Sequence, residues 1–281
     1  FFFKQKTAYE ITYGDWSSDV CSSDLPPAVP TNLVTEPVVS FTLVREPGAW
    51  LDHDNVLRRF MPSPVPDAIW FWGGEGSPYQ FFTAIPHQSR ADFNTRYGPS
   101  LVSQLQPIAD FVGTGRVSLD TNESVINWRG TPFVLPRVQF KESGTNPYVM
   151  AETFPQGDFG PSLTPALIER VSNRTNLVVF DWEYVTLRFD TWFRIGSLAM
   201  LCGNYEQILA KTPTLGFIQK LQLHTKWSGN TTTEVLQTGP RELTINARGP
   251  FAVNSFEMFW LANWLESPNF PAANFLVPMP Q

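Results

Sequence analysis

The sequence predicts an all-β protein, an antiparallel sandwich or barrel with a few short helices in its loops. Apolar residues recur with a period of two in several segments, as they do in strands with one buried face. Helical patterns are short, and clusters of turn-forming residues separate the strands. The regular alternation of strands and helices that marks a parallel fold is missing. Together these features favour antiparallel strands.

The strands predicted in the first half of the chain begin with residues 38–44, where β-branched and other apolar residues predominate. Residues 79–85 and 124–128 show weaker strand patterns. Residues 133–140 also have the pattern of a strand. Pro136 has no N–H to donate to a neighbouring strand, so we expect this segment at an edge of the sheet.

The second half of the chain contains the clearest alternation, at residues 217–227, where polar and apolar side chains take turns. Residues 242–247 and 251–260 are predicted as a strand pair, with a break at residues 248–250. A long strand is predicted over residues 177–193, because one face would collect Leu177, Val179, Val185, Leu187 and Phe189.

Four short helices are predicted between the strands. Asp52 is placed to cap a turn or two that ends near Phe60, and residues 100–111 carry leucines at helical spacing despite Pro107. Ser162 is a candidate N-cap for the third helix, and residues 204–211 form the fourth.

Residues 1–25 resemble translated sequencing adapter. Residues 4–11 and 15–25 are what a flow-cell adapter and its adjoining read primer encode in one reading frame. A match of this length is far longer than chance provides, so these residues are excluded from the fold. We expect a metagenomic origin, a single domain over residues 26–281, and a natural N-terminus that is missing.

Charge is sparse in this chain. Without residues 1–25, it has 18 basic and 22 acidic residues and a net charge of about −4, which argues against a nucleic-acid surface along the whole chain. Charged residues make up 16 % of the sequence, against about 25 % in ordinary domains, while aromatics reach 14 % and prolines number 25. This composition indicates proline-rich loops and large contacts with other subunits or a ligand.

The sequence predicts no metal site, no cofactor and no membrane span. His53, His87 and His224 are far apart in sequence, and none belongs to a pair with metal-ligand spacing. Cys202 is the one cysteine outside residues 1–25, which favours a reducing compartment. Polar residues interrupt the longest apolar runs, including residues 251–261, before they reach membrane-spanning length.

The sharpest candidate for catalysis is the carboxylate pair Asp181 and Glu183. On a strand these residues would share a face about 7 Å apart, which suits two carboxylates flanking a glycosidic bond. The segment 181–184 resembles the end of a catalytic strand motif in a chitinase family. The alternative is a strand whose acidic side chains reach solvent or pair with Arg188 or Arg194, and we favour this alternative.

Tryptophans form a second candidate site. Residues 70–72, together with Trp260 and Trp264, would suit stacking on sugars, but also core or subunit contacts. We favour the core and subunit contacts. The carbohydrate-active alternative is thus a β-sandwich binding module that uses tryptophans, or a glycoside hydrolase that uses Asp181 and Glu183.

Parts of the chain resemble the jelly-roll capsid proteins of picorna-like RNA viruses. Residues 55–60 are similar to their short helix ending in basic residues. Residues 128–131 and 193–197 are similar to their aromatic-Arg-Gly-Ser element. Residues 256–260 are similar to their last strand, with aromatic residues ahead of a proline-rich tail at 268–280.

The resemblance implies a non-enzymatic structural protein that self-assembles into an icosahedral shell. It implies an eight-stranded jelly-roll sandwich whose partners are copies of itself and other capsid subunits. Viral RNA would be contacted through an N-terminal arm that precedes residue 26. The expected location is the virion, and the host cytoplasm during assembly.

Overall fold

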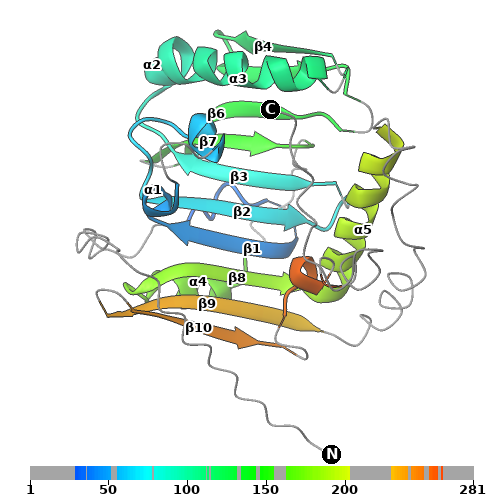
Figure 1. Cartoon of the computed structure of the whole chain (residues 1–281). Coiled ribbons are helices and arrows are strands. Elements are labelled where there is room, and N and C mark those ends of the chain that lie inside the picture. The colour runs from blue at the N-terminus through cyan, green and yellow to red at the C-terminus, as the bar shows by residue number, and fades with distance from the viewer. Residues whose placement is uncertain are drawn as a thin grey trace, which may run out of the picture. The chain divides into compact units, whose positions relative to one another are not determined.

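The computed structural model shows a β-rich protein and confirms that part of the predicted fold class (Figure 1). It contains one antiparallel sheet of ten strands with a few helices. The structure describes residues 29–35, 37–51, 56–77, 79–111, 113, 115–131, 134–143, 146–154, 163–202, 229–239, 242–249, 253–258 and 261. The predictions at residues 204–211 and 217–227 lie outside these ranges.

The ten strands follow the order β10-β9-β8-β1-β2-β3-β7-β6-β5-β4 across the sheet. A jelly roll consists of two packed sheets, whereas the described strands form one. In chain order the strands are β1 (Val38–Arg45), β2 (Ala68–Gly74), β3 (Phe81–Pro86), β4 (Arg116–Asp120), β5 (Val125–Arg129), β6 (Arg137–Ser143), β7 (Asn146–Glu152), β8 (Leu177–Tyr184), β9 (Asn230–Gly239) and β10 (Glu242–Arg248).

The helices connect the strands. They are α1 (Pro47–Trp50), the 3-10 helix η1 (Val56–Phe60), α2 (Arg90–Asp92), the π-helical turn η2 (Phe93–Tyr97), α3 (Gly98–Phe111), α4 (Pro165–Ser172) and α5 (Val185–Cys202). The predicted helices at residues 56–60, 100–111 and 162–171 correspond to η1, α3 and α4. The N-cap of α4 is Thr164, whose Oγ1 accepts a hydrogen bond of 3.4 Å from the N–H of Leu167; the predicted cap, Ser162, lies outside the described ranges.

Two segments predicted as strands contain a helix in the structure. The strand predicted at 177–193 ends at Tyr184, and α5 follows. Val185 and Phe189 are buried while Leu187 is 40 % exposed. A strand would have placed all three on one face, whereas a helix brings residues four apart together and turns the residue between them away. The prediction is confirmed for residues 177–184, which form β8, and it is wrong from Val185 on, where the apparent period of two belongs to a helix.

The segment predicted as a strand at 251–260 contains a helical turn at residues 255–258. Ser255 and Met258 are buried while Phe256 is 43 % exposed, as helical spacing requires. The N–H of Asn254 donates to Glu257 Oε2 at 2.8 Å, and the N–H of Glu257 donates to Asn254 Oδ1 at 2.8 Å. This reciprocal pair is a capping box, which favours a helix start over a strand.

The edge position predicted for residues 133–140 is also wrong. Strand β6 begins at Arg137 and lies between β5 and β7. Pro136 precedes the strand, and its carbonyl accepts a hydrogen bond of 3.1 Å from the N–H of Trp128. The missing N–H of proline therefore costs the sheet no ladder bond.

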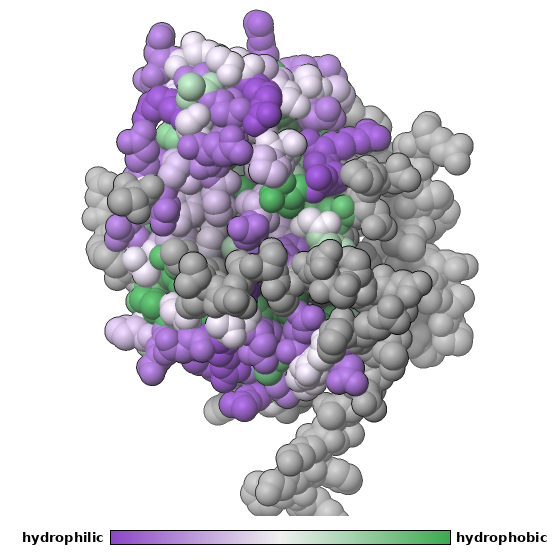
Figure 2. Space-filling view, turned by 90° about the vertical axis from the view of Figure 1, so that its left-hand side faces the viewer, coloured by the Kyte–Doolittle hydropathy of each residue, from purple (hydrophilic) through white to green (hydrophobic). Residues whose placement is uncertain are grey.

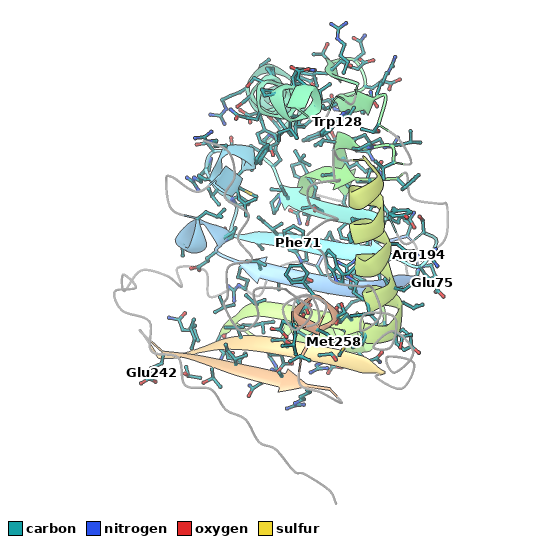
Figure 3. All side chains as sticks on the ribbon, turned by 45° about the vertical axis from the view of Figure 1, so that its right-hand side comes forward. Phe71, Glu75, Trp128, Arg194, Glu242 and Met258 are labelled. Atoms are coloured by element: carbon teal, nitrogen blue, oxygen red, sulfur yellow. The ribbon has the colours of Figure 1, made fainter. Side chains whose placement is uncertain are left out.

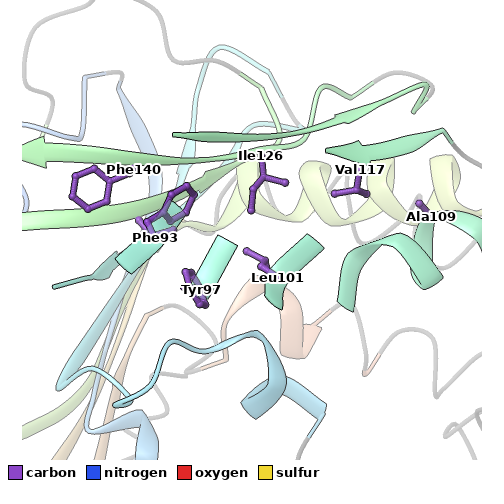
Figure 4. Close-up of a cluster of buried hydrophobic side chains, with 8 residues drawn as sticks. Phe93, Tyr97, Leu101, Ala109, Val117, Ile126 and Phe140 are labelled. Carbon is purple, nitrogen blue, oxygen red and sulfur yellow. The ribbon is translucent and has the colours of Figure 1, made fainter. Parts of the chain in front are cut away.

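The helical segment from α2 to α3 covers the β4 end of the sheet. Side chains from η2 and α3 pack with side chains from β4 to β7 in one buried cluster (Figure 4). Its members are Phe93, Tyr97, Leu101, Ala109, Val117, Ile126, Phe140 and Val149. Burial of these aromatic and aliphatic groups holds the helices against this part of the sheet.

Internal contacts divide the chain into two compact units. The first unit comprises residues 1–181 and 233–246, and the second comprises residues 182–232 and 247–281. Strands β8, β9 and β10 contribute residues to both units. The single domain expected over residues 26–281 stays a prediction.

Candidate functional site

The predicted carboxylate pair lies on β8, and both side chains have partners within the fold. Asp181 Oδ1 accepts a hydrogen bond of 2.6 Å from Thr42 Oγ1. Glu183 is buried, and its carboxylate accepts hydrogen bonds from the N–H of Ser255 and, at 2.7 Å, from Ser255 Oγ. Glu183 therefore holds the first residue of the helical turn at 255–258. Glycoside hydrolysis by this pair stays a prediction.

One of the three histidines, His87, lies within the described part of the chain; His53 and His224 do not. The His87 side chain is enclosed by three rings, with centroids 5.3 Å away for Tyr97 and 6.3 Å away for both Phe93 and Phe140. Its Nε2 lies 3.0 Å from Asp92 Oδ2. Burial lowers the pKa of His87, and Asp92 opposes this effect.

A cavity of about 240 Å³ lies beside His87 and is walled by a proline-rich segment, residues 62–66. Its other polar lining includes Asp67 and Asp92. Within the described ranges, however, no group of three His, Cys, Asp or Glu side chains could hold a metal ion. Cys202 ends α5, and its side chain lies outside what the structure describes.

The tryptophans of β2 belong to the core. Trp70 and Trp72 are buried on one face of the strand, while Phe71 on the other face is 37 % exposed. Trp70 packs edge-on against Tyr148 at 5.9 Å, and Trp72 stacks on Phe82 at 5.4 Å. Trp260 and Trp264, the other tryptophans considered for sugar stacking, lie outside the described ranges.

An apolar groove of about 230 Å³ lies between α3 and the sheet. The strand residues in its wall come from β3, β5, β6 and β7, and Leu105 of α3 closes one side. Figure 3 shows Trp128, one of these residues, at the α3 end of the sheet. The main apolar lining residues are Phe81, Leu105, Ile126, Trp128, Pro136 and Val138.

Two exposed apolar residues are close in the chain to residues that line the groove. Leu135 precedes the lining residue Pro136, and its N–H donates at 2.8 Å to the carbonyl of Thr153, which also lines the groove. The Leu135 side chain is 60 % exposed. Ile108 follows Leu105 by about one helical turn and is also exposed. The groove thus has exposed apolar residues beside its lining residues in the chain.

A buried charge network lies in the wall of the groove. The Glu152 side chain is fully buried, and its Oε1 accepts hydrogen bonds from Arg137 Nε and, at 2.9 Å, from Gln139 Nε2. The register explains the pairing, because Glu152 is directly opposite Arg137 on β6. Burial lowers the pKa of Arg137, but the guanidinium of an arginine stays charged at neutral pH. The network thus fixes the ends of β6 and β7.

The two terminal strands of the sheet, β4 and β10, each offer one edge that pairs with no other strand of the sheet. An unpaired edge presents N–H and C=O groups that can bind another strand. On the face that Figure 2 shows, the described apolar residues form only small separate patches in a mainly hydrophilic surface. The groove and the strand edges are therefore candidates for contacts with another molecule.

No family model, curated protein or solved structure matches this chain. No helix in the described ranges has the length and apolar character needed to cross a bilayer. The groove was not predicted from the sequence, because it is formed by residues from four strands and a helix. The apolar residues 133–135, which lie between Pro132 and Pro136, were a possible signal of a contact surface. The sequence alone does not show, however, that Leu135 is exposed.

Proposed function

We propose that this chain is a structural coat-protein subunit, which packs against copies of itself in a capsid shell. The observation that carries the proposal is the apolar groove beside α3, together with the exposed Leu135 that directly precedes its lining residue Pro136. Apolar groups gain free energy when they leave water, at about 25 cal/mol per Å². A neighbouring subunit that covers the groove would supply this gain.

The composition supports the same proposal. Charged residues are few and aromatic residues are abundant, as in the buried centre of protein interfaces. An exposed apolar region on a soluble monomer is a liability for aggregation, whereas the same region in a shell is covered by the next subunit. Unpaired edges at β4 and β10 add backbone groups for contacts between subunits.

The resemblance to capsid proteins of picorna-like viruses suggests the kind of assembly. The proposal includes an icosahedral shell, contacts with other capsid subunits and no catalysis, with the virion as the site of action. The jelly-roll topology belongs to this proposal as well. The structure supports its coarse feature, a β-rich antiparallel fold, and the described strands join in one sheet.

Sedimentation velocity and negative-stain electron microscopy of the full chain test this proposal. We expect particles or defined oligomers whose fraction rises with protein concentration. A chain that sediments as a monomer throughout the micromolar range would contradict the proposed function.

Two matched variants test whether the groove is the contact. Leu135→Glu places a charge directly before the lining residue Pro136. Leu57→Glu makes the same change at a leucine with nearly the same exposure, 58 %, that has no lining residue beside it in the chain. We expect Leu135→Glu to reduce the assembled fraction at least tenfold and Leu57→Glu to leave it largely unchanged. Equal effects of the two variants would show that the groove is not a specific contact. Circular dichroism would confirm that both variants are folded.

A further inference from the structure

The outer edge of β4 carries the backbone groups of Val117 and Leu119, and the N–H of Val117 is bonded to a side chain of α3. The N–H of Val117 donates at 2.9 Å to Gln106 Oε1 of α3, so it points away from the neighbouring strand β5. In an antiparallel strand alternate residues point their backbone groups to the same side. Leu119 therefore presents its N–H and C=O to the outer edge as well.

The sequence of β4 is self-complementary in charge. The strand begins with Arg116, has Ser118 at its centre and ends with Asp120. If a second copy pairs antiparallel around Ser118, Arg116 stands opposite Asp120 of the second copy, and the reverse pair forms as well. Both end residues are exposed. Asp120 also caps the turn after β4, because its Oδ1 accepts hydrogen bonds from the N–H groups of Asn122 at 2.9 Å and Glu123 at 3.3 Å. Opposite charges that face each other across two strands stabilise the pairing.

A like-charge pair within the chain strengthens this argument. Arg116 is directly opposite Arg129 on β5, and both side chains are exposed. Like charges directly opposite on neighbouring strands are unfavourable. A carboxylate from a second copy, on the other side of Arg116, would offset this repulsion.

We infer that β4 is a docking strand for a second copy of this chain, which pairs with it antiparallel about a two-fold axis at Ser118. The inference rests on the proposed function and names one contact of the assembly. Val117 and Leu119 then exchange N–H···O=C bonds with Leu119 and Val117 of the second copy. Such a contact is isologous, because both copies use the same surface.

The alternative partner strand, β10, fits β4 poorly. It begins with Glu242 and ends with Arg248. Antiparallel pairing of β4 with β10 would bring Arg116 toward Arg248 and Asp120 toward Glu242, so like charges would meet at both ends. Antiparallel pairing of β10 with a second copy of β10 would also place opposite charges together. We favour β4 because Arg116 lies opposite Arg129, and a carboxylate from a second copy would offset their repulsion. Docking at β4 requires that Gln106 release the N–H of Val117.

A charge-reversal series on the full chain tests the inference. Arg116→Asp and Asp120→Arg each create two repulsive pairs at the two-fold contact, so we expect each variant alone to raise the dissociation constant of the dimer at least tenfold in analytical ultracentrifugation. An equimolar mixture of the two variants restores opposite charges at every position. We expect the mixture to form heterodimers about as tight as the dimer of the unchanged chain.

Arg116→Asp also separates association from folding. The change removes the repulsion between Arg116 and Arg129, so the variant monomer should unfold at the same or a higher denaturant concentration than the unchanged chain. Unchanged association of both single variants would overturn the inference, and so would a mixture that stays monomeric.

Cross-linking locates the axis independently. Residues opposite each other in a pair without backbone hydrogen bonds have Cα atoms about 4.5 Å apart, which a disulfide can bridge. We expect Ser118→Cys to form a disulfide-linked dimer under mild oxidation. The unchanged chain controls for disulfides formed by its own cysteines, and Thr121→Cys controls for cross-links that form by random collision.

The outcomes distinguish the two proposals. If the chain assembles but Ser118→Cys does not cross-link above the controls, the β4 contact is wrong and the proposed function stands. If the unchanged chain is monomeric in every assay, both proposals fail.

Discussion

Buried charges in the first unit each have more than one partner. Glu152 accepts hydrogen bonds from Arg137 and Gln139. Glu234, also buried, pairs with Arg170 and Arg174, each at 2.8 Å. A single ion pair seldom offsets the cost of removing a carboxylate from water, whereas two donors satisfy more of its oxygen lone pairs. These residues therefore hold neighbouring elements in register.

Removal of a buried carboxylate should be costly. Glu152→Ala leaves Arg137 and Gln139 without their acceptor, and we expect a loss of about 2–3 kcal/mol in the free energy of unfolding. Arg137 is partly exposed, which keeps the loss below that of a fully buried pair. The control is Glu142→Ala, because Glu142 is 66 % exposed and its oxygen lies 3.8 Å from Arg90. Urea denaturation should show a change within about 0.5 kcal/mol for the control. Similar losses in both variants would contradict the role of burial.

The burial of His87 should make the fold sensitive to acid. Because its pKa in the folded protein lies below the usual value of 6.5, the unfolded chain binds a proton more readily. The contribution of His87 to the free energy of unfolding is therefore fully present above pH 6.5. It is lost as the pH falls through the pKa of His87 in the folded protein. Each unit of pKa depression corresponds to about 1.4 kcal/mol.

Denaturation midpoints at pH 7.5 and 5.5 measure this effect, with His87→Gln as the comparison. We expect the unchanged chain to lose more stability than the variant over this interval, because the variant has no imidazole to protonate. An equal loss in both proteins would show that other groups control the acid sensitivity.

At the scale of elements, the hairpin of β4 and β5 depends on its glycines. Gly115 enters β4 with a φ of +71°, in the left-handed region that favours glycine. A Cβ atom at this position would lie 1.5 Å from the carbonyl oxygen of Arg129. The backbone of β5 therefore leaves no room for a side chain where β4 begins.

Two alanine variants separate steric conflict from backbone strain. Gly113 also has a positive φ, +65°, but a Cβ there would meet nothing within 4 Å. We expect Gly113→Ala to lower the free energy of unfolding by about 1 kcal/mol, the cost of a left-handed alanine. Gly115→Ala should cost at least about 3 kcal/mol, since the hairpin must also move apart. Thermal denaturation would check the order, and equal losses would contradict the close approach of β4 and β5.

At the scale of the whole molecule, assembly is expected to show the signature of apolar burial. Apolar association is driven by entropy near room temperature and weakens on cooling, and sulfate strengthens it. Light scattering of the full chain should therefore fall between 25 °C and 4 °C and rise with sodium sulfate. Assembly that strengthens on cooling and dissociates in sulfate would show that polar contacts, and not the groove, hold the subunits together.

Some parts of the fold could be predicted from local pattern. Residues 38–44, 79–85, 124–128 and 242–247 were predicted as strands and form β1, β3, β5 and β10. The helix α3 was predicted despite Pro107, which lies within it. Strands β2, β4, β7 and β9 were not predicted. The sequence of β2 is apolar at nearly every position, and β4 begins and ends with a charged residue, so neither segment shows a clear alternation of polar and apolar residues.

The sequence by itself determined the β-rich class, the sparse charge and the helices η1, α3 and α4, because side-chain alternation and capping act over a few neighbouring residues. The tertiary structure alone decided the rest. It placed Val185 and Phe189 on a helix and brought Leu105 of α3 against four strands to form the groove. It also made β4 a terminal strand with Arg116 opposite Arg129. The physical reason is that burial and strand order depend on residues far apart in the chain, which local patterns do not specify.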